Sequence, residues 1–322
     1  MDKVEQSRIL DSSGRVASRR KRRLKTPPVS EACNKVLDAF NTGCGSSMLV
    51  GRPRLGKTYA ARWICETIRE LFGSVNWYEV PFESNTRASE SGFFSLMLKM
   101  VGHQFTTGRR PRDLRDRLCE FLIERASESP LGTVILLLDE AQNLNELHWT
   151  WLAEISNSID QAGFSLFTLS TGQKSLYVTR NTLEELRNEH DGEFIIGRFF
   201  LDMNDFRGLR TENDVRLTFR EYDNSPFGPD ESIKWIEGAL PIAYRAGWRL
   251  EQMTTVVWNA YSQEWHDRKR NDKIEIPMTY FDLLVRQILA DSERFNVENP
   301  VIRLEHAINL IQKSQFSKSI SI

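Results

Sequence analysis

The sequence has few of the residues that build metal sites or disulfide frameworks. Its 322 residues include four cysteines and five histidines. No two cysteines form a CxxC pair, and the histidines are scattered along the chain. This argues against a zinc site or a disulfide scaffold, and reduced core thiols in a cytosolic protein are the expectation. The cysteines are Cys33, Cys44, Cys65 and Cys119.

Long apolar runs are also lacking. No stretch approaches 18 uninterrupted apolar residues, and the N-terminus has no apolar segment typical of a secretory signal. We therefore expect a cytoplasmic protein without membrane contact. The formal net charge is only −1, but the first 25 residues hold nine Lys and Arg against three Asp and Glu. Basic charge is thus concentrated at one end of the chain.

Short apolar runs alternate with helical patterns through the first two thirds of the chain. Runs that suit buried strands occur at residues 48–50, 75–80, 134–138 and 164–170. Alternation of this kind predicts an α/β fold with a parallel sheet, in which helices cover both faces.

After about residue 205 the strand signal fades and helical spacing dominates. The segment 223–230 is rich in Pro, Gly and Asp, which is typical of a linker or loop. We therefore expect three parts. They are a basic flexible arm over residues 1–28, an α/β core over 29–222 and a mainly helical, lid-like region over 223–322.

A complete Walker A pattern, GxxxxGK[ST], follows the first apolar run. Its glycines let backbone N–H groups point at phosphates, and the helix that begins there adds its positive end. Lys57 is expected to reach the β- and γ-phosphates, and the Thr58 hydroxyl to ligate magnesium. The pattern predicts ATP and Mg²⁺ as cofactors. The residues predicted to contact them are Gly51, Arg52, Pro53, Arg54, Leu55, Gly56, Lys57, Thr58 and Tyr59.

Two acids follow the most apolar run of the sequence. Asp139 comes directly after five aliphatic residues, so it should emerge at the carboxyl edge of the sheet, where ligands bind in such folds. A Walker B Asp holds magnesium from this position. Glu140 is the next residue, and a carboxylate there can orient the attacking water and take its proton.

The fourth apolar run ends in Ser170-Thr171, and either hydroxyl is a candidate to contact the water or the γ-phosphate. With a strand between Walker A and Walker B, this order resembles the AAA+ ATPases, in which the hydroxyl residue is called sensor 1. The resemblance implies a three-layer αβα P-loop fold with a smaller helical lid. The choice between the two residues stays open at this stage.

Further motifs resemble those of the compact transposition regulators of the TnsC/TniB family, over about residues 30–290. The resemblance rests on the Walker A motif with the apolar run before it and on three later motifs. In TniB-like proteins a small-Gly-polar turn follows the sensor 1 strand, and an Arg-Phe pair follows the next helix. The motifs here are Leu138-Asp139-Glu140-Ala141-Gln142, Ser170-Thr171-Gly172-Gln173 and Ile195-Ile196-Gly197-Arg198-Phe199.

The chain is most similar in size to family members from CRISPR-associated transposons. The resemblance implies that ATP-bound subunits form a ring or filament around double-stranded DNA at a target marked by a targeting complex. They then recruit and activate the transposase, and hydrolysis or transposase contact takes the assembly apart. The implied partners are therefore duplex DNA, further copies of this chain, the transposase and target-selector proteins.

Two arginines receive roles through this resemblance. Lys57 and magnesium cover only part of the charge on a phosphoryl group in transfer, and an arginine of a neighbouring subunit can cover the rest. Arg198 is the candidate for this catalytic finger, and Arg187 is the alternative. Arg249, within Gly247-Trp248-Arg249-Leu250, falls where such proteins open the lid helix, and it is a candidate nucleotide contact.

Two basic stretches are candidates to bind DNA phosphates. The first is the arm segment Arg19–Lys25, whose simpler interpretation is a solvated tail. The second is a loop that the resemblance places facing the central pore. The alternative is that its arginines pair with acids along a helix. The predicted DNA contacts in this loop are Thr106, Thr107, Arg109, Arg110 and Arg112.

Two other functions are compatible with the motifs. One is a different AAA+ machine, such as a replication initiator or helicase loader, although no C-terminal recognition helix with a basic face stands out. The other is a P-loop kinase, against which the Glu140 carboxylate and the strand between the Walker motifs favour hydrolysis over transfer.

Overall fold

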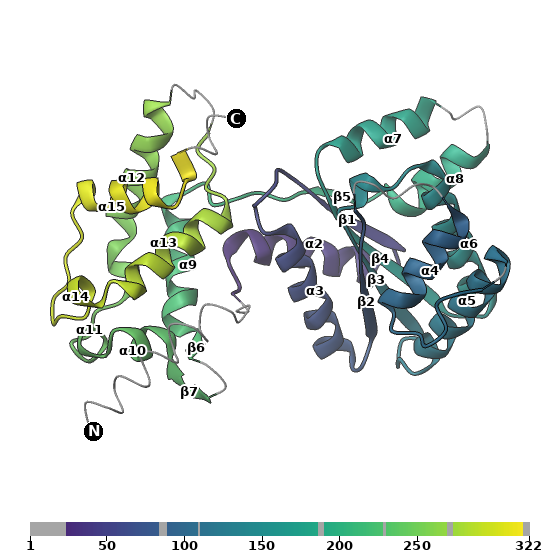
Figure 1. Ribbon diagram of the computed structural model, residues 1–322, viewed down its shortest axis with the longest axis horizontal. Coiled ribbons are helices and arrows are strands. Elements are labelled where there is room, and N and C mark those ends of the chain that lie inside the picture. Colours follow the sequence, from purple (N-terminus) through teal and green to yellow (C-terminus); the bar gives the residue numbers. More distant parts are fainter. Residues whose placement is uncertain are drawn as a thin grey trace. The chain divides into compact units, whose positions relative to one another are not determined.

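The computed structural model describes residues 24–83, 89–108, 110–185, 190–227, 230–268 and 273–317. The chain forms two compact units (Figure 1). The sheet unit is Glu31–Phe206, and the helical unit combines the described residues 24–30 and 207–317.

The sheet unit is built on five parallel strands in the order β2-β3-β4-β1-β5. Its strands are β1 (Ser46–Val50), β2 (Asn76–Pro81), β3 (Thr133–Asp139), β4 (Ser165–Gly172) and β5 (Met203–Asp205). Its helices are α2 (Pro27–Asn41), α3 (Lys57–Phe72), α4 (Glu90–Met100), α5 (Pro111–Ser127), the 3-10 turn η1 (Ala141–Asn143), α6 (Glu146–Gln161), α7 (Ser175–Glu185) and α8 (His190–Phe199).

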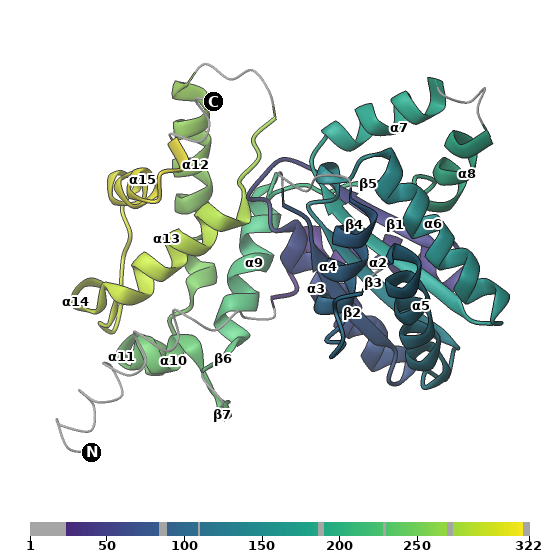
Figure 2. The same cartoon turned by 45° about the vertical axis from the view of Figure 1, so that its right-hand side comes forward.

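Helices cover both faces of this sheet (Figure 1, Figure 2). On one face, Leu136 and Leu138 of β3 pack with side chains of α4, α5, α6 and α8 in a continuous core. On the other face lie α2 and α3, joined by Phe40, whose ring meets Phe72 of α3 and Phe167 of β4. The predicted α/β fold with three αβα layers is confirmed.

Strand β3 explains why the sheet could be located from sequence. All seven of its residues are buried, as expected for a central parallel strand covered on both faces. Strand β5 has no such signal, because it is three residues long and its residues are half-buried or exposed. It pairs only with Met48–Val50 at the edge of the sheet.

The helical unit has its own apolar core, which includes Phe219, Tyr261 and Phe281. A short antiparallel strand pair, β6 and β7, begins within the segment predicted to be a linker. The elements are α9 (Glu212–Asn224), β6 (Pro226–Phe227), β7 (Asp230–Lys234), α10 (Trp235–Ala239), α11 (Pro241–Arg245), η3 (Leu250–Met253), α12 (Thr254–Asp267), α13 (Met278–Ala290), α14 (Ser292–Phe295) and α15 (Leu304–Lys313).

The two units meet between Phe206 and Arg207, and not after residue 222 as the sequence suggested. The expected boundary falls inside α9, whose Val215, Phe219 and Tyr222 belong to the core of the helical unit. Helix α9 therefore belongs to the helical unit. The loss of strand signal near residue 205 lies close to the boundary between the units.

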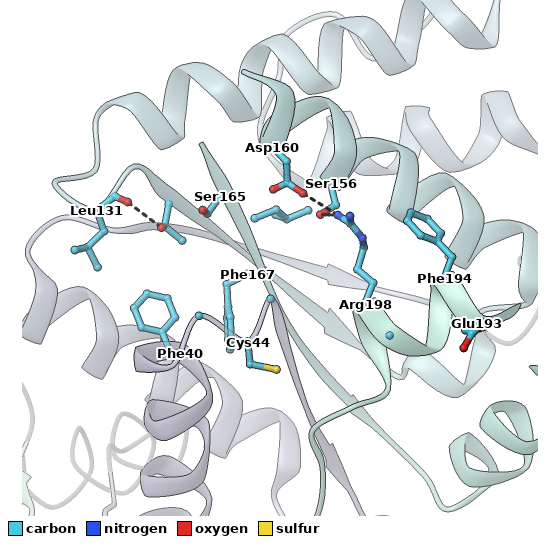
Figure 3. Close-up of a pocket in the computed structure, with 15 residues that line it drawn as sticks. Phe40, Cys44, Leu131, Ser156, Asp160, Ser165, Phe167, Glu193, Phe194 and Arg198 are labelled. Atoms are coloured by element: carbon cyan, nitrogen blue, oxygen red, sulfur yellow. Dashed lines mark hydrogen bonds and ion pairs between the residues drawn. The ribbon is translucent and has the colours of Figure 1, made fainter. Parts of the chain in front are cut away.

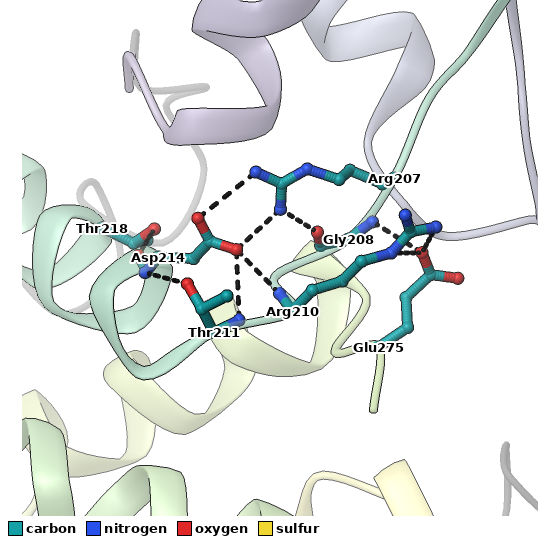
Figure 4. Close-up of polar contacts among 7 residues, drawn as sticks. All are labelled: Arg207, Gly208, Arg210, Thr211, Asp214, Thr218 and Glu275. Atoms are coloured by element: carbon teal, nitrogen blue, oxygen red, sulfur yellow. Dashed lines mark hydrogen bonds and ion pairs between the residues drawn. The ribbon is translucent and has the colours of Figure 1, made fainter. Parts of the chain in front are cut away.

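A buried carboxylate fixes the start of the helical unit (Figure 4). Asp214 Oδ2 accepts from the guanidinium of Arg207 at 2.6 Å and from the backbone N–H groups of Arg210 and Thr211 at 2.8 and 3.2 Å. Thr211 Oγ1 in turn accepts from Asp214 N at 3.0 Å, which completes a capping box for α9. Burial raises the pKa of Asp214, but these hydrogen bonds outweigh it and hold the pKa below its usual value.

The end of the predicted arm belongs to this unit as well. Leu24 is buried in the core of the helical unit, and Lys25 N donates to Glu221 Oε2 at 3.0 Å. Helix α2 begins at Pro27, earlier than the expected start near Ser30, because proline is well suited to the first turn of a helix. The rest of the arm, including residues 19–23, lies outside the described residues.

Candidate nucleotide and magnesium site

The loop between β1 and α3 needs glycine at both ends of the Walker A pattern. A Cβ on Gly51 would lie 2.4 Å from the carbonyl oxygen of Phe206 and 3.1 Å from Leu55 Cδ1, so no side chain fits there. Gly56 has φ +102°, a left-handed conformation that favours glycine. Between them, Leu55 is buried and fastens the loop, while Arg52, Pro53 and Arg54 are exposed.

Lys57 sits at the first position of α3 and is only 7% exposed. Its Nζ donates to the carbonyl oxygens of Gly51 at 2.9 Å and Arg52 at 2.8 Å. Burial lowers the pKa of Lys57, whereas the negative charges of Glu140 and Asp139 raise it. No acid lies in the first turn of α3, so the positive charge of Lys57 and of the helix N-terminus is not offset there. This combination suits a phosphate group.

Asp139 joins three elements of the sheet unit. Its Oδ1 accepts from Thr58 Oγ1 of α3 at 2.8 Å and from Thr171 Oγ1 of β4. Its side chain lies at the carboxyl end of β3 and is 8% exposed. Thr171 is thus the hydroxyl that faces the Walker B acid. Ser170 points to the opposite face, because side chains alternate along a strand.

The oxygen ligands at this point fit magnesium. Magnesium keeps several waters and usually takes only one or two protein carboxylates together with substrate phosphates. Thr58 Oγ1 and Asp139 Oδ1 meet that requirement at the edge of the phosphate loop. Within the described residues, no group of three or more His, Cys, Asp and Glu gathers to form a metal site without a phosphate.

Glu140 lies one residue beyond Asp139, at the end of the strand. Its backbone is left-handed, with φ 56° and ψ 42°, which is rare for a residue with a side chain and is often found at functional sites. Gln142 Nε2 donates to its carboxylate at 2.5 Å. The sequence motif included Gln142, but nothing in the pattern assigned it a contact.

One helix face carries polar contacts that the sequence did not predict. Along α3, Arg62 lies one turn after Thr58 and forms a bidentate ion pair with Glu79 of β2. One turn further, Glu66 accepts from Trp77 Nε1 at 3.2 Å. The i, i+4, i+8 spacing of Thr58, Arg62 and Glu66 is the only sequence signal for this row. The row ties the phosphate-loop helix to β2 and β3.

Arg198 lines a pocket at the amino ends of β1, β3 and β4 (Figure 3), whereas the phosphate loop follows the carboxyl end of β1. It stands in the last turn of α8, not after the helix as expected. Its guanidinium donates to Asp160 Oδ2 at 3.0 Å, to Asn157 Oδ1 at 2.8 Å and to Ser156 Oγ, all near the end of α6. It also lies 5.1 Å from the ring centroid of Phe194.

The pocket beside Arg198 has a volume of about 560 Å³. Its walls include Gly45, Thr133 and Ser165, which lie at the amino ends of β1, β3 and β4. Because the strands are parallel, Asp139 and Arg198 cannot meet within one sheet unit. Arg187, the alternative finger, lies outside the described residues.

The predicted DNA loop leads into α5. Thr106 is half-buried, Thr107 and Arg110 are exposed, and Pro111 opens the helix. Arg112 forms an exposed i, i+4 ion pair with Asp116 at 3.6 Å, which is the local pairing left open above. Arg117 of α5 stabilises the loop, because its Nη1 donates to the carbonyls of Phe105 and Thr107 at 3.1 and 3.2 Å. Arg109 lies outside the described residues, and a role in DNA binding stays a prediction.

Arg249 and Tyr59 also remain predicted nucleotide contacts. Arg249 belongs to the helical unit, where its Nη1 donates to the carbonyls of Tyr244 and Trp248 at 3.0 and 2.7 Å. Its guanidinium stacks 3.9 Å from the centroid of the Tyr244 ring. Tyr59 lies in the first turn of α3 and is half-buried.

A phosphate loop after one parallel strand, with an acid at the end of another, is the arrangement of a P-loop fold. Residues 41–177 match the family model described as the AAA domain. The chain thus has the α/β P-loop fold of the AAA+ ATPases. None of the helices in the described parts of the chain is long and apolar enough to cross a bilayer.

One solved structure supports this fold, and two others are similar to a lower degree. The ORC2 protein of Aeropyrum pernix, in its ADPNP–ADP complexes, matches with a TM-score of 0.54 and 11% identity over 89% of this chain and 67% of that chain. Cdc6p from Pyrobaculum aerophilum has a TM-score of 0.45 and 14% identity, over 90% of this chain and 80% of that chain. Domain III of the Thermotoga maritima replication initiation protein DnaA has a TM-score of 0.49 and 12% identity, over 90% and 93%. No curated protein sequence matches this chain.

The contact to Asp139 predicts that the two neighbouring hydroxyls of β4 differ in importance. We expect Thr171→Val to slow Mg²⁺-dependent ATP hydrolysis by about 10- to 100-fold, because a hydrogen bond to a charged group is worth roughly 1.5–3 kcal/mol. Ser170→Ala is the matched control and should stay within about twofold of the unmodified protein. Phosphate release measures both. Equal effects of the two substitutions on the hydrolysis rate would contradict a specific role for Thr171 in the site.

Proposed function

We propose that this protein is an ATP-hydrolysing, DNA-binding AAA+ regulator of DNA transposition. In this proposal it assembles as a ring or filament on target DNA and connects target selection to the transposase. The observation that carries the ATPase part is the convergence of Thr58 and Thr171 on Asp139, beside the buried cation of Lys57. The transposition part is supported by the resemblance of the motifs to the TnsC/TniB family.

Each residue of the site has a task in ATP binding. The backbone N–H groups of the loop from Gly51 to Gly56 hold the phosphates. Lys57 exchanges its hydrogen bonds to the loop carbonyls for contacts to the β- and γ-phosphates. Thr58 and Asp139 hold the magnesium ion, which, when bound, neutralises developing charge on the phosphate oxygens. Thr171 keeps the Asp139 carboxylate in place.

Hydrolysis needs a base near the γ-phosphate. Water attacks the γ-phosphorus as the bond to the β–γ bridging oxygen breaks, and the water proton passes to the carboxylate of Glu140. Glu140 follows the metal-binding Asp139 directly, so its position beside the phosphates comes from the strand end itself. A kinase would instead place an acceptor hydroxyl where this water lies, and this is why Glu140 favours hydrolysis.

Binding to DNA is assigned to exposed basic side chains. A ring on DNA without sequence preference uses Lys and Arg on phosphates and few base contacts. Arg110 is exposed at the start of α5, and Arg112 is exposed one turn from its weak partner Asp116. A surface ion pair of this kind is worth at most about 1 kcal/mol, so Arg112 can exchange it for a phosphate.

Replication initiation is the second candidate function. It is favoured by the likeness of fold to the ORC2 protein, which extends over 89% of this chain. Sequence preference separates the two candidates. An initiator assembles on particular DNA sites, whereas the proposed regulator assembles with ATP on duplexes of any sequence.

Replacement of the base tests hydrolysis and DNA assembly together. Glu140→Gln should keep ATP binding but lower the hydrolysis rate by about 10²- to 10⁴-fold, because the amide keeps the shape and cannot take a proton. Complexes with ATP on random-sequence duplex DNA should then last longer, as measured by fluorescence anisotropy. Glu146→Gln changes an exposed acid of α6 and is the control. If Glu140→Gln hydrolyses ATP at the normal rate, Glu140 is not the base.

We propose that the active site is shared between subunits, with Arg198 as the finger. Within one subunit Arg198 is held by α6 at the far edge of the sheet, so it can complete only the site of a neighbour. An arginine that covers charge in phosphoryl transfer is worth roughly 10³–10⁵ in rate. To reach the phosphates of a neighbouring subunit, Arg198 must first break its ion pair with Asp160.

Mixed subunits test this sharing. Arg198→Ala and Lys57→Ala should each be inactive alone. In a mixture, some interfaces join the intact phosphate loop of one variant to the intact Arg198 of the other, so ATP hydrolysis should partly return. Arg69→Ala, an exposed arginine at the end of α3, is the control and should be active alone. Normal hydrolysis by Arg198→Ala on DNA would place the finger elsewhere.

A further inference from the structure

Gln142 joins two strand ends through its side-chain amide. In η1, its Nε2 donates to Glu140 Oε2 at 2.5 Å, and its Oε1 accepts from the backbone N–H of Gln173 at 3.1 Å. Gln173 lies between β4 and α7, two residues after Thr171. The side chain therefore bridges the acid that follows β3 and the segment that follows β4.

These two contacts fix the orientation of the amide. An ionised carboxylate only accepts hydrogen bonds, and a backbone N–H only donates. The NH₂ group of Gln142 must therefore face Glu140 and its carbonyl oxygen must face Gln173, so a flipped amide would lose both bonds. A hydrogen bond to an ionised acceptor is also shorter and stronger than one between neutral groups.

The approach of the amide to the end of β4 depends on Gly172. A Cβ at this position would lie 2.9 Å from Gln142 Oε1 and 2.3 Å from Leu176 Cδ1. The absence of a side chain at the last residue of β4 is what allows the bridge. Two links thus join the ends of β3 and β4 on either side of Glu140, namely Thr171 to Asp139 and Gln142 to Gln173.

Glu140 needs such support because its own backbone is unfavourable. A non-glycine residue in the left-handed region is held there by its surroundings. The turn η1 contributes, since Asn143 N donates to the carbonyl of Glu140 at 3.0 Å. Of the two carboxylate oxygens, Oε2 is bound to Gln142, while Oε1 makes no hydrogen bond with the part of the chain that the structure describes.

We infer that Gln142 is a positioning residue for hydrolysis. It holds Glu140 by Oε2, so that Oε1 is the oxygen that accepts the proton of the attacking water. The bridge also makes the orientation of Glu140 depend on the start of α7 through Gln173. This inference rests on the proposed ATPase function, and it adds a residue that neither Walker motif contains.

The test separates the donor end of the amide from its acceptor end. Gln142→Met removes both hydrogen bonds at nearly the same length. Gln142→Glu keeps an acceptor for the Gln173 N–H but removes the donor to Glu140. Gln173→Ala is the matched control, because it removes a neighbouring glutamine side chain and keeps the backbone N–H that Gln142 binds. Glu140→Gln sets the rate expected without a base.

We expect both Gln142 variants to hydrolyse ATP about 10- to 100-fold more slowly in single turnover, the size of one lost charge-assisted hydrogen bond. Their affinity for a non-hydrolysable ATP analogue and their melting temperature should change little. Gln173→Ala should hydrolyse ATP like the unmodified protein. A fall in kcat with unchanged nucleotide affinity is the signature of positioning.

If Glu140→Gln is inactive, the ATPase proposal stands, and either of two results would then overturn the inference about Gln142. In one, both Gln142 variants keep the normal rate. In the other, Gln142→Glu is normal and only Gln142→Met is slow, which would mean that the contact to Gln173 is structural. A different result, equal hydrolysis by Glu140→Gln and the unmodified protein, would overturn the ATPase proposal and the inference with it.

Discussion

The site depends on one carboxylate oxygen, Asp139 Oδ1, that accepts from two hydroxyls on different elements. Thr58 and Thr171 are 113 residues apart in the chain, and both donate to this atom at the carboxyl edge of the sheet. A carboxylate that is 8% exposed needs such partners, because an unpaired buried charge is costly. The phosphate loop, β3 and β4 are therefore aligned by a contact that includes the proposed magnesium ligands Thr58 and Asp139.

The parallel sheet gives the subunit two different edges. Lys57, Asp139 and Glu140 lie at the carboxyl edge, whereas Arg198 and its pocket lie at the amino edge. A single sheet unit thus holds the proposed phosphate-binding groups and the candidate arginine finger, but it cannot bring them together. In the proposed assembly of subunits on DNA, both edges would take part in one reaction.

The sequence predicts the parts of this site that depend on local pattern. The Walker A loop and the apolar strand before Asp139 could be recognised without a structure, because each is specified by neighbouring residues. The choice of Thr171 over Ser170 could not, since it depends on which face of β4 meets β3. The contacts of Gln142 could not be predicted either. Its partner Gln173 is 31 residues away, and the approach of the two depends on the missing side chain of Gly172. The short β5 and the start of the helical unit at Arg207 depend on edge pairing and packing, which carry little local signal.

The most direct measurement of the central claim is ATP turnover by the unmodified protein and by Lys57→Ala, each with and without duplex DNA of random sequence. We expect the unmodified protein to release phosphate, and to do so faster on DNA. We expect Lys57→Ala neither to bind ATP nor to assemble on DNA. Loss of Lys57 should abolish binding because it removes the buried cation that contacts the loop carbonyls. Near-normal ATP affinity of Lys57→Ala, or no phosphate release by the unmodified protein under any of these conditions, would contradict it.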